Sequence, residues 1–347
     1  MFKYLKKILP FVLISPLLTV ITITACTPAN KVNIQYSTNI HNTNTEKVLL
    51  LIDSSLQAYK AFNEKTPAKC QTAKITTPSG YEFIEDWTGI DSLFGKEKTE
   101  ECYGVIFRTK AAPYTYIFAF RGTASLLDVL DDMGAEAKTF IPFDKTSSIP
   151  NNIEVESGFF NVYHKSGDSS TSMQEQLFSL LDKYNASNKP ITELYITGHS
   201  LGSSLSELFT LDIAISRPEI KASTINFASP RVGNAAFIAF YQQQVAQKQA
   251  DTRTLRVQNV YDKVPCTPLR SMGYQHLDNA YLVAFHKKSF LGREDLLSCH
   301  SSDNYHAVLH KAAESSKGVY ITNSLNVPAN GYDIVSDAPD SKLICNY

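Results

Sequence analysis

The sequence has little net charge, and neither basic nor acidic residues predominate. Its 33 Lys and Arg residues nearly balance 34 Asp and Glu residues, which gives a net charge of −1. Nucleic-acid-binding domains carry basic patches, so this balance argues against that class of protein. Hydrophobic residues make up 43% of the 347 residues. That content is enough for a large buried core and too high for a mostly disordered chain.

The sequence also lacks internal repeats and any clear linker after residue 45. Before that point, residues 27–45 are rich in Asn and Thr and poor in apolar side chains, which is typical of a flexible tether. We therefore predict one catalytic-size domain over residues 46–347, although the length alone would permit two domains. The stretch 316–347 contains no motif that we can interpret.

An uninterrupted apolar run is missing at the N-terminus, because Pro10 and Pro16 interrupt the stretch 8–25. This disfavours a membrane-spanning anchor helix. Lysines precede the stretch, and it ends in the letters ITAC, a pattern of small residues before a cysteine that indicates export and processing. It resembles a bacterial lipoprotein signal, in which residues 1–25 are removed and Cys26 is lipidated, for example with palmitate. An ordinary cleaved signal peptide is the alternative.

Helical and strand-like segments alternate between about residues 170 and 262. Such alternation predicts an α/β fold with a mostly parallel central sheet flanked by helices. Ser172 with Glu175 forms a capping-box pattern at the start of one helix. The predicted helices are 46–63, 172–184, 201–215 and 234–247, and the predicted strands are 102–109, 114–120, 192–197, 222–228 and 254–260.

The letters GHSLG, residues 198–202, stand between a predicted strand and a predicted helix. A serine hydroxyl is a poor nucleophile at neutral pH and needs a base that is oriented by an acid. In a strand–turn–helix context, G-x-S-x-G forms an elbow that exposes the serine. We therefore predict that Ser200 is a nucleophile and that the backbone N–H of Leu201 stabilises an oxyanion. The alternative is an ordinary loop with a helix cap.

An acid and then a histidine should follow the elbow in the chain. Asp262 lies after the predicted strand 254–260, at the strand end where α/β sheets place functional groups. Order alone also permits Asp278, Glu294 and Asp295 as the acid.

The choice of base is more open. His300 lies just before a helical segment that begins near Ser302, so that it can approach the serine from a loop. His306 and His310 lie one turn apart on that helix. The histidines that follow Asp262 are His276, His286, His300, His306 and His310.

Several segments together resemble the class 3, or fungal-type, lipase family of the α/β-hydrolase superfamily. The resemblance covers roughly residues 48–315. Ser203 and Ala228 stand where this family usually has glycine, and Glu156 replaces a histidine, which indicates a divergent member. The segments are ITGHSLGSSLSELFTLDI, FAFRGT, VESGFFNVY, INFASPRVGN, RVQNVYDKVPCTPLRSMGYQH and HSSDNYHAVL.

The resemblance implies a catalytic triad of Ser200, Asp262 and His300. It selects His300 because the family's last motif has a tyrosine five residues after its histidine, here Tyr305. His306 remains the alternative base. The resemblance also implies that Thr123 is a second oxyanion donor, beside Leu201.

Three further expectations accompany this resemblance. His276 matches a position outside the triad and is interpreted as structural, and no metal or organic cofactor is required. In this family a lid occupies the region that corresponds to residues 124–154. The apolar cluster here, with residues such as Leu127 and Met133, could form such a lid or pack permanently on the core.

Besides Cys26, the chain has five cysteines, an odd number that leaves at least one outside an intrachain disulfide. Export permits disulfides. Cys266 and Cys299 each lie next to a presumed triad segment, so we predict that they are close and that they are candidates for a bridge. Cys70 and Cys102 are a second candidate pair.

The sequence thus predicts a serine hydrolase of lipid carboxylic esters, anchored to a membrane of the cell envelope or the cell surface. A phospholipase A1 and a feruloyl-type carbohydrate esterase are alternatives with the same chemistry. A catalytically silent lipoprotein that binds lipids or a host partner is an alternative from another class. The residues do not specify an oligomeric state.

Overall fold

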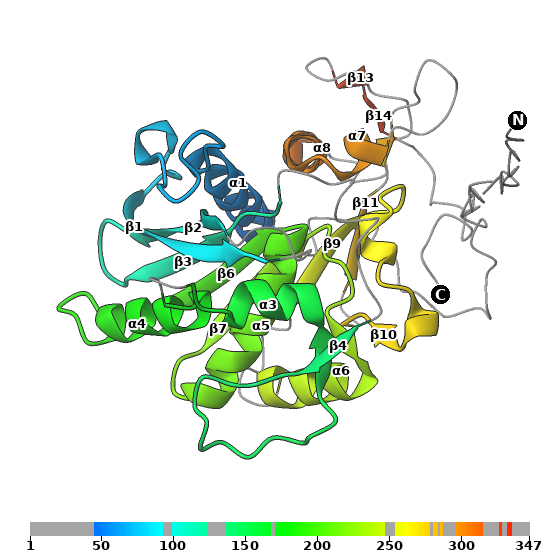
Figure 1. Cartoon of the computed structure of the whole chain (residues 1–347). Helices are drawn as coiled ribbons and strands as arrows, with labels where there is room; N and C mark the ends of the chain where they lie inside the picture. Colours follow the sequence, from blue (N-terminus) through cyan, green and yellow to red (C-terminus); the bar gives the residue numbers. More distant parts are fainter. Residues whose placement is uncertain are drawn as a thin grey trace, which may run out of the picture.

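A seven-stranded sheet forms the centre of the molecule, with helices on both of its faces (Figure 1). The strand order is β1-β2-β3-β6-β7-β9-β11. The computed structural model describes residues 45–92, 99–123, 136–167, 171–246, 254–277, 280–283, 285–286, 296–314, 326–327 and 332–334.

The sheet is antiparallel at one edge and parallel elsewhere. Pairs β1–β2 and β2–β3 are antiparallel, whereas each neighbouring pair from β3 to β11 is parallel. The predicted α/β architecture with a mostly parallel sheet is therefore confirmed. The strands are β1 (Tyr81–Asp91), β2 (Thr99–Thr109), β3 (Thr115–Phe120), β6 (Glu193–His199), β7 (Ala222–Phe227), β9 (Leu255–Asn259) and β11 (Ala280–Val283).

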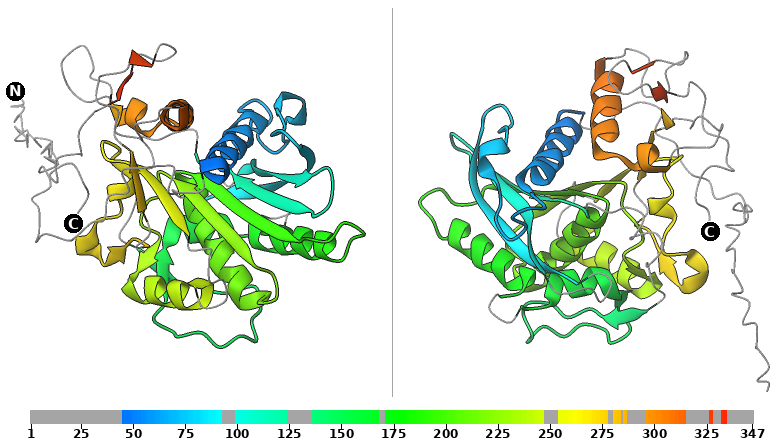
Figure 2. Two further views of the ribbon diagram at one scale, coloured as in Figure 1. Left: turned by 180° about the vertical axis from the view of Figure 1, so that it is seen from behind. Right: turned by 45° about the horizontal axis from the view of Figure 1, so that its top comes forward.

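Two groups of helices cover the sheet. Helices α1 and α8 lie on one face, and α3, α4, α5 and α6 lie on the other (Figures 1 and 2). A short helix, α7, precedes α8 in the chain. The bounds are α1 (Thr45–Ala61), α3 (Ser157–His164), α4 (Met173–Asn185), α5 (Leu201–Ser216), α6 (Ala235–Tyr241), α7 (Leu296–His300) and α8 (Ser302–Glu314).

Alternating side chains of the strands build a separate core on each face. In β3, Ile117 and Ala119 pack with α1 and α8, whereas Phe118 and Phe120 pack with α3, α4 and α5. This division follows from the two-residue period of a strand. A strand that is apolar on both faces is thus buried between two helical layers.

Smaller elements surround this core. A four-stranded sheet has the order β10-β8-β5-β4, and three short strands have the order β12-β14-β13. A π-helical turn over Gln242–Ala246 continues α6, so the helix predicted over 234–247 changes its geometry after Tyr241. The short strands are β4 (Ala137–Thr139), β5 (Glu154–Glu156), β8 (Gly233–Asn234), β10 (Tyr274–Gln275), β12 (Phe285–His286), β13 (Asn326–Val327) and β14 (Tyr332–Ile334), and the 3₁₀ turns are Thr72–Lys74, Val264–Cys266 and Arg270–Met272.

Two local predictions agree closely with the structure. Helix α1 occupies nearly the predicted range, and α4 begins with the predicted capping box. The Ser172 hydroxyl accepts a hydrogen bond from Glu175 N, and the Glu175 carboxylate accepts one from Ser172 N. Both signals are local in sequence, so they need no tertiary information.

The two cysteine predictions have different outcomes. Cys70 and Cys102 form a disulfide with their Cα atoms 5.1 Å apart, which confirms that pair. Cys266 is also disulfide-bonded, but Cys299 retains a buried thiol, so the predicted bridge between them is wrong. A hydrogen bond connects the segment that precedes Asp262 to the segment of Cys299 instead: Asn259 Nδ2 donates to the carbonyl oxygen of Cys299 at 3.0 Å.

Several predictions fall on residues that the structure does not describe. They are the signal segment 1–25, all but the last residue of the tether 26–45, and the apolar part of the lid region, residues 124–135. Within the described ranges, none of the helices combines the length and the apolar character that crossing a membrane requires.

A buried carboxyl group lies in the middle of the long helix α5. Glu207 is 2% exposed, and its Oε1 accepts a hydrogen bond from the Ser229 hydroxyl at 2.8 Å. Burial raises the pKa of Glu207 from 4.5 to about 7, and the Ser229 hydrogen bond and Arg256 oppose this rise only in part. Glu207 therefore links the stability of the fold to pH.

We predict that Glu207→Gln removes part of the pH dependence of folding. In the unfolded chain Glu207 ionises near pH 4.5, but in the folded chain it stays protonated up to about pH 7. Between these values unfolding releases a proton, so the free energy of unfolding falls as pH rises, by about 3 kcal/mol in total. Urea unfolding across this range should show a smaller fall for the variant. The exposed Glu219→Gln is the control, and equal pH profiles for Glu207→Gln and wild type would contradict the prediction.

Candidate active site

Ser200 lies at a strained turn between β6 and α5. Its backbone has φ 60° and ψ −130°, a region that residues with a Cβ rarely adopt. A Cβ at Gly198 would lie 2.2 Å from the carbonyl oxygen of Gly202, so no larger residue fits there. The predicted elbow is present, and Ser200 stands at the N-terminus of α5.

Asp262 and His300 form a buried hydrogen-bonded pair although they are 38 residues apart in the sequence. Asp262 follows β9, and its Oδ2 lies 2.8 Å from His300 Nδ1. His300 is the last residue of α7, whereas the sequence predicted a loop at this position. Its Nε2 is buried and has no hydrogen-bond partner among the described residues. The ring is therefore oriented by the acid and keeps its second nitrogen for another group.

Further hydrogen bonds hold the carboxylate of Asp262. The Tyr305 hydroxyl donates to Oδ2 at 2.9 Å, and the backbone N–H of Val264 donates to Oδ1 at 2.9 Å. The Tyr305 hydroxyl in turn accepts from the backbone N–H of Asn259 at 2.7 Å. Tyr305 thus joins α8 to the end of β9 and fixes the direction of the acid.

The sequence did not predict that two further side chains, His199 and Tyr59, lie next to His300. His199 Nε2 lies 2.7 Å from the carbonyl oxygen of His300, and its Nδ1 lies 2.9 Å from the hydroxyl of Tyr59. Since a carbonyl only accepts, Nε2 carries the proton and Nδ1 accepts from Tyr59. Burial and the neighbouring His300 lower the pKa of His199 well below its usual value. No local signal linked Tyr59 to this site, because it lies 140 residues before His199.

The turn after β3 lies directly beside the elbow. A Cβ at Gly122 would lie 3.0 Å from Ser200 Cβ and 2.7 Å from the carbonyl oxygen of His199. This contact brings the predicted oxyanion residue Thr123, which is partly exposed, next to the turn at Ser200. Arg121 is buried below the turn and donates to the Gly122 carbonyl oxygen at 2.8 Å.

Two of the three departures from the family pattern make hydrogen bonds, and the third has a backbone conformation that favours glycine. The Ser203 hydroxyl lies 2.8 Å from the Gly198 carbonyl oxygen and 2.7 Å from that of Phe227. Glu156 caps α3 by accepting from Phe159 N at 2.8 Å. Ala228 has a positive φ of 53°, which explains why glycine suits this position better.

The other candidate residues lie elsewhere or outside the described ranges. His306 and His310 contact Asp53 on α1 and not Asp262. His276 Nε2 lies 2.6 Å from the carbonyl oxygen of Pro265, as a structural histidine should. The alternative acids Asp278, Glu294 and Asp295 are not among the described residues.

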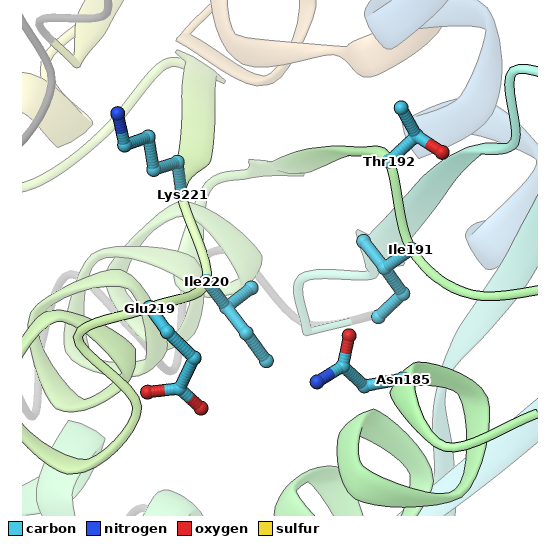
Figure 3. Close-up of a pocket in the computed structure, with 6 residues that line it drawn as sticks. All are labelled: Asn185, Ile191, Thr192, Glu219, Ile220 and Lys221. Atoms are coloured by element: carbon cyan, nitrogen blue, oxygen red, sulfur yellow. The ribbon is translucent and has the colours of Figure 1, made fainter.

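A small pocket lies at the amino ends of β6 and β7, whereas Ser200 follows the carboxyl end of β6. Its volume is about 180 Å³, and its lining residues precede β6 and β7 or end α4 (Figure 3). Ser200 and Asp262, by contrast, follow the carboxyl ends of their strands. Functional groups in α/β sheets gather at the carboxyl ends, so this pocket is separate from the candidate active site.

Comparison with known proteins agrees with this geometry. Residues 117–272 match the class 3 lipase family. The chain is 31% identical over 183 residues to phospholipase A(1) DAD1, chloroplastic, of Arabidopsis thaliana, a match that covers 51% of this chain and 39% of that protein. It is 30% identical over 164 residues to the secreted mono- and diacylglycerol lipase MDL3 of Malassezia globosa, with coverage of 47% and 50%. The match thus spans half or less of each of these two relatives.

Solved lipase structures share the fold. The lipase of Rhizopus microsporus var. chinensis superposes with a TM-score of 0.54 at 19% identity, over 76% of this chain and 84% of that one. The LIP2 lipase of Yarrowia lipolytica gives 0.51 at 19% identity, over 70% and 79%. The predicted α/β-hydrolase fold is confirmed, and residues 117–272 are similar to the class 3 lipase family.

We predict that Ala228→Gly stabilises the fold by about 1 kcal/mol. The positive φ of Ala228 costs about 1–2 kcal/mol for a residue with a Cβ and little for glycine, and this exceeds the loss of about 0.8 kcal/mol from removing the buried methyl group. Ala239→Gly, on the exposed side of α6, should instead destabilise by about 1 kcal/mol, because its backbone is helical. Urea unfolding of both variants tests the sign, and destabilisation by Ala228→Gly would refute the prediction.

Proposed function

We propose that this protein is a serine hydrolase that cleaves carboxylic ester bonds of lipids. The buried hydrogen bond between Asp262 Oδ2 and His300 Nδ1, at 2.8 Å, carries the proposal, together with the strained backbone of Ser200. An acid-oriented histidine beside an elbow serine is the arrangement that activates a hydroxyl for acyl transfer.

In the first half of the reaction, Ser200 Oγ attacks the ester carbonyl carbon while His300 Nε2 accepts the hydroxyl proton. The carboxylate of Asp262 stabilises the imidazolium that forms, and Tyr305 keeps that carboxylate in place. The neighbouring His199 is neutral at the pH of the reaction, so it adds no positive charge beside the imidazolium. The protonated His300 then gives its proton to the leaving alcohol.

In the second half, water attacks the acyl-enzyme, with His300 as the base. The tetrahedral oxyanion forms twice, and we assign its donors to the backbone N–H of Leu201 and to Thr123. Leu201 is the first residue of α5, where backbone N–H groups have no partner within the helix. Neither half-reaction requires a metal ion or an organic cofactor.

The substrate class follows from the relatives. One relative is a mono- and diacylglycerol lipase and another is a phospholipase A(1), so both acylglycerols and phospholipids are esters that this fold cleaves. We propose acylglycerol lipase activity as the first candidate and phospholipase A1 activity as the second. The two differ in the surface that receives the head group, not in the triad.

We further propose that the protein is exported and held at a membrane by a lipid on Cys26, with residues 27–45 as the tether. The small residues before Cys26 support this proposal, and the secreted Malassezia relative supports export alone. A lipid anchor would place the hydrolase close to its substrates. Metabolic labelling with palmitate, compared between wild type and Cys26→Ala, tests the anchor.

Removal of the nucleophile should abolish hydrolysis. We predict that Ser200→Ala and His300→Ala each lower kcat by about 10⁴-fold or more, because triad residues act as a unit. The measurement is the release of fatty acid from mono-, di- and triacylglycerols and from phosphatidylcholine. A phosphatidylcholine rate above all acylglycerol rates would favour the second candidate.

The comparison with His306→Ala tests the choice of base. His306 contacts Asp53, so its variant should retain far more activity than His300→Ala. Loss of activity in His306→Ala with retention in His300→Ala would reverse the assignment. Equal rates for wild type and Ser200→Ala would refute hydrolysis through this site.

The oxyanion assignment gives a separate prediction. Thr123→Val keeps the shape of the side chain and removes the hydroxyl, so kcat should fall about 100-fold while KM changes little. Thr123→Ser should retain most of the activity, and the exposed Thr146→Val is the control. A Thr123→Val variant within about threefold of wild type would remove Thr123 from the oxyanion hole.

A further inference from the structure

Two histidines of α8 and an aspartate of α1 meet at one edge of the helical layer. His306 Nε2 lies 3.0 Å and His310 Nε2 lies 2.7 Å from the same oxygen, Asp53 Oδ1. The two imidazole rings have centroids 4.4 Å apart. All three ligand atoms lie within 4.8 Å of one another. None of these residues belongs to the proposed triad.

The two helices hold these side chains on rigid supports. Spacing of four residues places His306 and His310 on one face of α8. Next to them, Val308 and Leu309 of α8 are buried in the same core as Leu51 of α1. The helices lie side by side in both views of this layer (Figures 1 and 2). Neither helix has to move far for the three side chains to share a ligand.

The chemistry of the donors matches one class of ion. Two imidazole nitrogens and one carboxylate oxygen are ligands that Zn²⁺ and similar transition metals prefer, whereas Ca²⁺ and Mg²⁺ prefer oxygen alone. A tetrahedral ion with bonds of about 2.0–2.2 Å separates its ligands by roughly 3.3 Å. The observed 2.7 and 3.0 Å separations from Asp53 are shorter than this value, and the two histidine nitrogens lie within 4.8 Å of each other, so rotamer changes of the side chains would bring all three separations to it.

The exposure of the three side chains allows an ion to enter from solvent. Asp53 is 34% exposed, and His306 and His310 are 34% and 38% exposed. A fourth position can then be filled by water, so three protein ligands suffice.

We propose that Asp53, His306 and His310 bind a divalent transition-metal ion, best matched by Zn²⁺, that fastens α8 to α1. The ion would act next to Tyr305, whose hydroxyl holds Asp262 Oδ2 at 2.9 Å. It would therefore steady the helix that positions the acid, without touching the reacting atoms. The binding site itself does not depend on the proposed function.

The test uses the full-length chain, stripped of metal with a chelator. Titration with Zn²⁺ is followed by calorimetry, and titration with Co²⁺ is followed by its visible absorption. We expect one ion per chain, and a rise in Tm of about 4 °C when free Zn²⁺ reaches about 100 times Kd. Ca²⁺ and Mg²⁺ at the same concentrations should change neither signal.

Variants locate the ion. His310→Gln and Asp53→Asn should each weaken Zn²⁺ binding at least tenfold and lower the rise in Tm to about half or less, because the first loses an imidazole nitrogen and the second loses the carboxylate charge. His164→Gln, on α3, is the matched control and should bind as wild type does. Far-UV circular dichroism without metal verifies that each variant is folded. Because two separate variants are tested, the comparison still holds if one of them does not fold.

Three results would overturn the proposal. They are no Zn²⁺ binding by the wild type, unchanged binding in both ligand variants, and equal binding of Ca²⁺. None of these results bears on ester hydrolysis, so failure of the metal site and failure of the proposed function are distinguishable.

Discussion

The close packing of the first turn of α5 against β3 and β6 is the constraint on which the candidate site depends. A Cβ at Gly202 would lie 2.7 Å from the carbonyl oxygens of Phe120 and Arg121, and one at Gly198 would meet the backbone of Gly202. Only glycine fits at these contacts. They force Ser200 into its strained conformation and bring the turn at Gly122 against it. The turn at Ser200 and the turn at Gly122 are therefore positioned by the same packing.

A second set of contacts positions Asp262 and His300, the proposed acid and base, relative to each other. Asn259, at the end of β9, bonds to the carbonyl oxygens of Phe285 and Cys299 and to the Tyr305 hydroxyl. These bonds join three segments that are distant in sequence. Each partner is buried, and a buried polar group without a partner is costly, so the network specifies one arrangement. The precision of the Asp262–His300 pair rests on this network more than on either residue alone.

The helical layer formed by α1 and α8 supports the site from outside. Tyr59 of α1 reaches His199, which holds the backbone of His300, and Tyr305 of α8 holds Asp262. The same two helices carry the Asp53, His306 and His310 cluster at their rim. Movement of one helix relative to the other would therefore disturb both Asp262 and His300, the proposed acid and base, and the proposed metal ion between the helices would limit that movement.

The sequence by itself determined the elements with local signals. Hydrophobic periodicity located α1, the capping box located α4, and glycine spacing located the elbow at Ser200. For the acid and the base, order along the chain left several residues open, and the resemblance to a known family singled out Asp262 and His300.

Only the tertiary structure decided which distant side chains meet. Tyr59 beside His199, Asn259 beside Cys299, and Asp53 beside His310 join residues separated by 140, 40 and 257 positions. It also showed that Cys266 and Cys299 are not bridged. Periodicity and motifs describe a segment and its immediate neighbours. Which side chains pack across the sheet depends on the register and on the closing of both cores, which no single segment encodes.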